Sequence, residues 1–177
     1  MSRSVRTAAF ALALAFAAGA AQAAVTDRSA AGFEVRHAAT IAAPPHKVWM
    51  KLMQPSGWWS SEHSWSGDAK NLSIDSSGCF CERLKHGAVR HMTVIFADED
   101  KALRMEGALG PLQFTGAAGR LGVTLKPVAA GTEVVMTFDA GGYAKGGLAE
   151  TLAAPVDQVL GAQLARLKKA LETGKPD

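Results

Sequence analysis

Residues 33–52 read FEVRHAATIAAPPHKVWMKL, and this stretch decides how the rest of the chain is interpreted. Residues 33–41 alternate loosely between apolar and polar side chains, a period typical of a β-strand. Pro44 and Pro45 end the strand, and proline suits the first turn of a helix because no N–H partner is needed there. The residues that follow share one apolar helical face, which consists of Val48, Trp49 and Leu52. The stretch therefore predicts a strand followed by a short helix.

Beyond residue 70 the chain continues as short alternating segments separated by turns. Strands are predicted at 71–75, 79–84, 88–97, 102–108, 112–115, 119–126 and 132–139. The two clearest strands each carry one apolar face, formed by Leu121, Val123 and Leu125 and by Val134, Met136 and Phe138. Strands with one apolar and one polar face are typical of an antiparallel sheet that is covered on one side only.

A long helix is predicted at the end of the chain, from about residue 155 to 172, with Pro155 in its first turn. Its apolar stripe at helical spacing is formed by Val156, Val159, Leu160, Leu164, Leu167 and Leu171. Arg166, Lys168 and Lys169 lie near its C-terminal end, where positive charge complements the helix dipole. The element order indicates a single α+β domain.

The first 23 residues have the three regions of an export signal. Arg3 and Arg6 form a positive segment, residues 8–18 form an apolar run, and Ala21-Gln22-Ala23 resembles a cleavage site. The apolar run is too short for a permanent transmembrane helix; an alanine-rich core helix is the alternative. Cleavage after Ala23 would leave a periplasmic or secreted protein without stable membrane insertion.

The charge balance argues against nucleic-acid binding. The chain of 177 residues has a formal charge of +3. Removing residues 1–23 takes away two of the 19 basic residues and none of the 16 acidic ones, which leaves a charge of +1. Nucleic-acid binding normally needs a basic face. We divide the remaining chain into a linker at 24–32, one domain at 33–173 and a tail at 174–177.

Several short segments, taken in order, resemble the START-related helix-grip superfamily, also called polyketide cyclase/dehydrase-like or SRPBCC proteins. They are Ile41-Ala42-Ala43-Pro44 followed by Val48-Trp49, Trp58-Trp59, Ile74-Asp75 with Gly78, and the closing helix. The heat-shock-protein ATPase activator-like branch is the most similar one. The resemblance implies a curved antiparallel sheet of about six to seven strands wrapped around the C-terminal helix, with a ligand cavity between them.

Apolar residues are predicted to line this cavity and bind the ligand. They are Trp58, Trp59, Met92, Met105, Phe114, Met136, Leu160 and Leu164. Val94, Phe96, Leu103, Val134 and Phe138 are expected to point to the same side of the sheet. Trp58, Trp59 and Trp65 lie in a turn-rich stretch, so they indicate either a cavity mouth that stacks on a ligand or a lid that closes the core.

Cys79 and Cys81 lie two residues apart on a predicted strand and point to the same face. Three interpretations stay open: free thiols that pack, a redox-labile disulfide, or a metal site completed by His86 and His91. Two sulfurs alone do not form a closed zinc site, so no metal and no cofactor is predicted.

No catalytic motif stands out. Cys79, His91 and a carboxylate could be arranged as nucleophile, base and orienting group, but no local signature supports this. His37, His46, His63, His86 and His91 fit solvated or half-buried positions. Glu82, Arg83 and Glu106 could place polar groups in the cavity or form charge pairs on the outer face.

The sequence therefore predicts an exported protein that holds an apolar or amphipathic small molecule, lipid-like or polyketide-like. A cyclase, dehydratase or hydrolase acting on such a ligand is the first alternative, although the sequence nominates no acid/base pair for it. A co-chaperone that activates a heat-shock ATPase is the second, and export argues against it.

Overall fold

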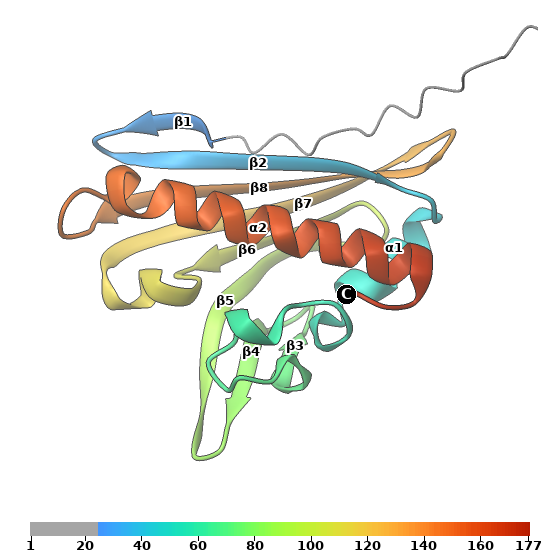
Figure 1. Ribbon diagram of the computed structural model, residues 1–177, viewed down its shortest axis with the longest axis horizontal. Helices are drawn as coiled ribbons and strands as arrows, with labels where there is room; N and C mark the ends of the chain where they lie inside the picture. The colour runs from blue at the N-terminus through green and yellow to red at the C-terminus, as the bar shows by residue number, and fades with distance from the viewer. Residues whose placement is uncertain (1–24) are drawn as a thin grey trace, which may run out of the picture.

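The structure, a computed structural model, describes residues 25–177 (Figure 1). Its strands are β1 (Val25–Ser29), β2 (Gly32–Ile41), β3 (Leu72–Ile74), β4 (Cys79–Leu84), β5 (Gly87–Asp98), β6 (Ala102–Gly107), β7 (Gly116–Val128) and β8 (Gly131–Tyr143). Its α-helices are α1 (Pro45–Leu52) and α2 (Leu148–Thr173). Four short 3₁₀ helices complete it: η1 (Pro55–Gly57), η2 (Ser61–His63), η3 (Ala69–Asn71) and η4 (Gly110–Phe114).

The eight strands form one antiparallel sheet in the order β1-β2-β8-β7-β6-β5-β4-β3. α2 lies along one face of the sheet beside β2 and β8 (Figure 1), and the core lies between them. The inward side chains of β7 and β8 are the alternating apolar residues that the sequence indicated, and all of them are buried. The α+β helix-grip fold predicted from the sequence is confirmed. None of the helices in residues 25–177 is long and apolar enough to cross a membrane.

Strand β5 is irregular at two places, and both change the direction of its side chains. Phe80 pairs with Met92 and Cys81 pairs with Arg90, so His91 is an extra residue opposite β4. Such a bulge lets consecutive residues face the same side, and His91 and Met92 are both buried. The second irregularity lies between Val94 and Phe96.

The second irregularity explains why the prediction that Phe96 faces inward is wrong. Phe96 pairs with Arg104 and is exposed, and the guanidinium of Arg104 lies 4.6 Å from the centre of its ring. A strict alternation from Met92 through Val94 would have placed it in the core. Val94 itself is half-buried.

Three other details differ from the expectation. β1 occupies most of the stretch assigned to a linker, and the sheet has eight strands where the resemblance implied about six to seven. Residues 112–115, expected as a strand, lie mostly in the 3₁₀ helix η4. α2 begins at Leu148, so Pro155 lies inside the helix. The early start follows from packing, because Leu148, Ala149 and Ala153 are buried, and this offsets the hydrogen bond that Pro155 cannot donate.

Candidate functional site

A cavity of about 260 Å³ lies between α2, η4, the loop around η2 and the sheet. α2 contributes Leu152, Pro155, Val156, Val159 and Leu160, which recur at helical spacing on one face. The loop segments contribute Glu62, His63, Ser64 and Trp65 on one side and Leu109, Gly110, Pro111 and Leu112 on the other. Trp59, Phe80, His91 and Phe138 complete the lining. The volume is slightly below the about 300–1,000 Å³ typical of pockets for drug-sized ligands.

Side chains of α2 hold the loop that forms one rim of the cavity. Gln163 is fully buried, and its Oε1 accepts a hydrogen bond from the Ser60 N–H at 2.9 Å. Since the oxygen of the Gln163 amide accepts from Ser60, the other end of the amide is the NH₂ group. Nε2 of Gln163 therefore donates to Nδ1 of His63, 3.2 Å away. Nε of Arg166 donates to the carbonyl of Trp58 at 2.9 Å. The cavity wall and its rim are therefore one connected unit.

The tryptophans of the turn-rich stretch, Trp58, Trp59 and Trp65, differ in their burial and in their position relative to the cavity. Trp58 is only 2% exposed and packs edge-on against Trp59, with ring centres 5.4 Å apart. Trp59 lines the cavity and donates from Nε1 to the carbonyl of His63. Trp65 lies at the rim, is 43% exposed, and stacks edge-on against Phe114.

The residues predicted to bind ligand divide into two groups. Trp59 and Leu160 line the cavity. Trp58, Met92, Met105, Met136 and Leu164 are buried in the core outside the cavity lining, and Phe114 is 79% exposed beside the rim. No ligand contact of these residues is established, so their role in binding stays a prediction.

A buried carboxylate–imidazole pair forms the polar part of the site. Glu82 follows Phe80 on the inward face of β4 and is 1% exposed. Its Oε2 lies 2.9 Å from Nε2 of His91 and also accepts from the Trp65 N–H, while Oε1 accepts from the Ser66 N–H. Three donors from β5 and the rim loop thus converge on one carboxylate.

The protonation states of Glu82 and His91 fit this geometry. Burial alone would raise the pKa of Glu82, but hydrogen bonds from Ser66, Trp65 and His91 outweigh burial and hold that pKa below its usual value. Burial lowers the pKa of His91, and the neighbouring carboxylate of Glu82 opposes this only in part. At neutral pH the pair is therefore an ionised carboxylate beside a neutral imidazole.

The pair is expected to make the protein less stable in acid. Because the pKa of His91 is lowered on folding, the unfolded chain takes up a proton first, so stability is lost as the pH falls below about 6.5. Glu82 adds to the loss below about 4.5, in the same direction. Urea unfolding at about pH 7.5 and about pH 5 should show a smaller acid loss for His91→Phe than for the wild type. Equal losses would contradict this assignment.

The cysteines form a disulfide, so free thiols and a metal site are both excluded as interpretations. Cys79 and Cys81 are joined on β4, with Cα atoms 5.4 Å apart instead of the about 6.5 Å of a regular strand. They alternate with the inward residues Phe80 and Glu82, so they face away from the cavity. A nucleophile role for Cys79 beside His91 is therefore wrong as well.

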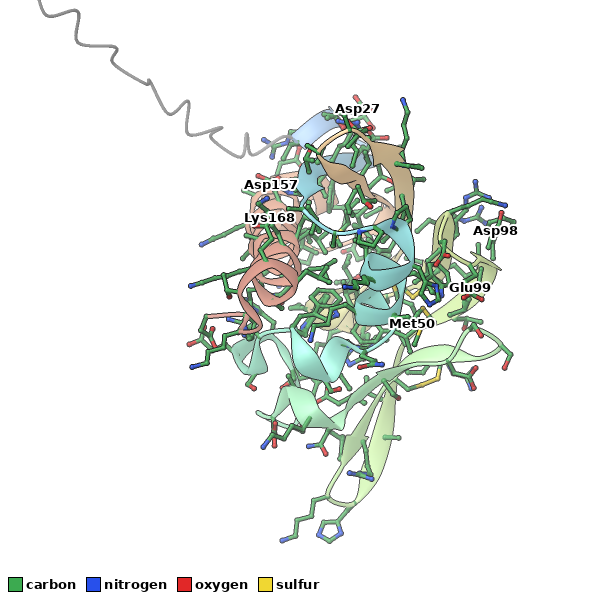
Figure 2. The ribbon with its side chains drawn as sticks, turned by 90° about the vertical axis from the view of Figure 1, so that its right-hand side faces the viewer. Asp27, Met50, Asp98, Glu99, Asp157 and Lys168 are labelled. Atoms are coloured by element: carbon green, nitrogen blue, oxygen red, sulfur yellow. A yellow bond between two sulfur atoms is a disulfide. The ribbon has the colours of Figure 1, made fainter. Side chains whose placement is uncertain are left out.

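Histidine burial also differs from the expectation, because His37 and His91 are buried. Nε2 of His37, on β2, lies 2.9 Å from Oδ1 of Asp157 on α2. Asp157 lies on α2, as Figure 2 shows. Gly161 permits the approach, because a Cβ there would lie 2.8 Å from Cε1 of His37. This pair joins the helix to the sheet and is not part of the cavity lining.

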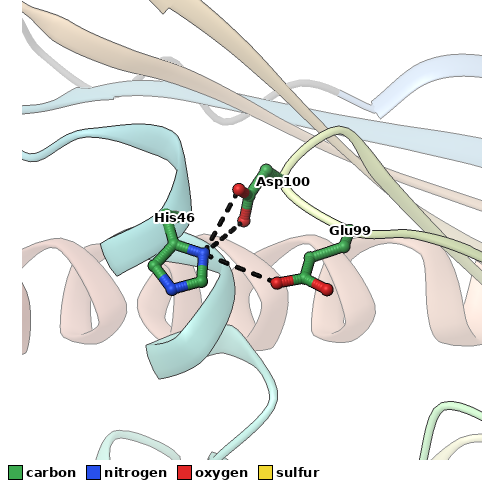
Figure 3. A group of neighbouring side chains, drawn as sticks. All are labelled: His46, Glu99 and Asp100. Carbon is green, nitrogen blue, oxygen red and sulfur yellow. Dashed lines mark hydrogen bonds and ion pairs between the residues drawn. The ribbon is translucent and has the colours of Figure 1, made fainter.

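His46, Glu99 and Asp100 form an exposed cluster between α1 and the turn after β5 (Figure 3). Nδ1 of His46 lies 3.1 Å from Asp100 and 3.5 Å from Glu99. Hydrogen bonds between side chains at the surface account for this arrangement. Glu106 forms a salt bridge with Arg120 on the outer face of the sheet. Of the two roles considered for Glu106, it therefore forms a charge pair and does not place a polar group in the cavity.

Comparison with known families matches residues 32–172 to the family described as polyketide cyclase / dehydrase and lipid transport. The chain belongs to this family. The resemblance identified in the sequence is thereby confirmed, and the match covers the sheet from β2 onward together with all but the last residue of α2. No curated protein matches this member of the polyketide cyclase/dehydrase family in sequence.

Solved structures with the same fold include three that are distant in sequence. A conserved protein of unknown function, EF2215 from Enterococcus faecalis, has a TM-score of 0.54 and 16% identity over 81% of this chain and 73% of its own. Aha1 from Colwellia psychrerythraea has a TM-score of 0.50 and 20% identity over 80% and 98%. DynU16, from the dynemicin biosynthetic locus, has a TM-score of 0.53 and 20% identity over 81% and 48%. At these identities the likeness shows the fold alone.

Proposed function

We propose that this polyketide cyclase/dehydrase family member is an exported protein that holds a small apolar or amphipathic molecule in the cavity. The cavity of about 260 Å³ carries the proposal. Aromatic and aliphatic side chains of α2, η4 and the sheet dominate its lining, while its polar residues gather at the rim loop and at His91. A mostly apolar concave site with few polar groups is the usual form of a small-molecule site.

Filling the cavity is expected to weaken the binding of an apolar probe. Val156 lies on the cavity face of α2, so Val156→Phe should weaken the binding of 1-methylnaphthalene at least tenfold, because the larger ring takes the space of the probe. Probe fluorescence in an equilibrium titration measures the affinity. Val128→Phe is the matched control, since Val128 lies exposed at the end of β7, outside the cavity lining. Equal affinities for the two variants would refute the proposed site.

Export rests on residues 1–23, which lie outside the described part of the structure. Their charged, apolar and small-residue regions support a cleaved signal. N-terminal sequencing of the protein recovered from its native cells is expected to begin at Ala24. A chain that begins at Met1 in the cytosol would contradict export without affecting the cavity.

A further inference from the structure

We propose that the cavity selects a molecule that is apolar over most of its surface and presents one hydroxyl or N–H donor to Nδ1 of His91. This inference rests on the proposed function and adds the chemical class of the ligand: a phenol, an alcohol or a similar donor on an apolar frame.

The hydrogen bonds around His91 define which ring nitrogen carries the proton. An ionised carboxylate can only accept, so Nε2 of His91, 2.9 Å from Glu82, must be the N–H donor. In a neutral imidazole the other nitrogen, Nδ1, then has a free lone pair and is an acceptor. Glu82 cannot release the ring easily, because two backbone N–H groups, those of Trp65 and Ser66, hold the same carboxylate.

Within the Glu82–His91 pair, Nδ1 of His91 is the polar atom that makes no hydrogen bond to the described part of the protein. It is fully buried and has no hydrogen-bond partner among residues 25–177. Buried polar atoms are normally hydrogen-bonded, and each exception calls for an explanation. His91 is one of the residues that line the cavity, and a donor on a ligand that packs against this residue would give Nδ1 the partner that the protein does not supply.

The local backbone supports a dedicated role for this ring. The bulge in β5 adds His91 opposite β4 and turns it inward beside Met92. Bulges recur where a strand must redirect a side chain next to a functional site. Phe80 packs against the ring at a centroid distance of 5.0 Å, which leaves an aromatic surface next to the acceptor and favours a flat ligand.

Two probes of nearly equal shape test the inference. 1-Naphthol and 1-methylnaphthalene differ by a hydroxyl in place of a methyl group, so only 1-naphthol can donate to Nδ1. We expect the ratio of their dissociation constants to shift by about tenfold against 1-naphthol when His91 is replaced by phenylalanine. His86→Phe is the matched control, because His86 is exposed in the β4–β5 turn and outside the cavity lining; it should leave the ratio unchanged.

The outcomes separate this inference from the proposed function. An unchanged ratio in His91→Phe would overturn the inference, while binding of both probes would still support the cavity as a site. Failure of both probes to bind the wild type would overturn both. The ring ¹⁵N resonances of His91 in the wild type give an answer that does not depend on a variant. Nδ1 should shift with 1-naphthol and not with 1-methylnaphthalene, and identical responses would overturn the inference.

Discussion

Replacing Glu82 with alanine is expected to lower the free energy of unfolding by about 3–5 kcal/mol, because three donors lose one shared buried acceptor and each unsatisfied donor costs about 1–3 kcal/mol. The N–H groups of Trp65 and Ser66 and Nε2 of His91 would all lose their acceptor. Leaving buried donors unsatisfied costs more than the hydrogen bonds contribute when made. Urea unfolding at neutral pH measures the change.

Glu106→Ala is the control for this experiment. Glu106 also lies on a strand and pairs with a basic residue, Arg120, but both side chains are largely exposed. Its loss should cost at most about 1 kcal/mol. Equal losses in the free energy of unfolding for the two alanine variants would show that Glu82 does not hold the rim loop. They would also contradict the conclusion that Glu82 fixes the orientation of the His91 ring.

Trp58→Ala is expected to destabilise the fold by about 3–5 kcal/mol, as is usual for truncating a large buried aromatic side chain. Trp58 is a ligand-binding residue in the prediction from the sequence, but in the structure it is buried against Trp59 and lies outside the cavity lining. Thermal or urea unfolding checks the size of the loss.

Trp65→Ala provides the comparison. Trp65 is half-exposed at the rim, where it contacts Phe114 and borders the cavity. We expect a clearly smaller loss than for Trp58→Ala, because 43% of the Trp65 surface stays in contact with water against 2% for Trp58, together with weaker binding of 1-methylnaphthalene. The reverse order of stabilities would show that the structure assigns the wrong tryptophan to the core.

Regular periodicity explains what the sequence predicted well. The period-two pattern of β7 and β8 and the helical spacing of α2 each depend only on local residues, and both correspond to buried faces. The short helix after Pro44 was predicted for the same reason, since proline at its start is a local signal.

The predictions that were wrong concern features that depend on contacts with residues far away in the chain. The bulge at His91 exists only against β4, and the irregularity before Phe96 only against β6, so strict alternation along β5 could not locate either. Pro155 lies inside α2 because tertiary packing of the preceding turn outweighs its local preference.

The polar part of the site has a signal in the sequence of β4. Phe80, Glu82 and Leu84 share one strand face, so the alternation that buries Phe80 also places Glu82 inward. A carboxylate on an apolar face requires partners. Its partner His91 could not be found in this way, because the bulge reverses the face that the alternation assigns to it.

Methyl ¹H–¹³C spectra of the wild type titrated with 1-methylnaphthalene test the central claim, that the cavity is a binding site, most directly. If the cavity binds the probe, the methyl resonances of Leu112, Val156 and Leu160, which line the cavity on two different elements, shift together and saturate. The methyl resonances of Val128, exposed on β7, should stay in place. Shifts confined to residues outside the lining, or no shifts at all, would contradict the account.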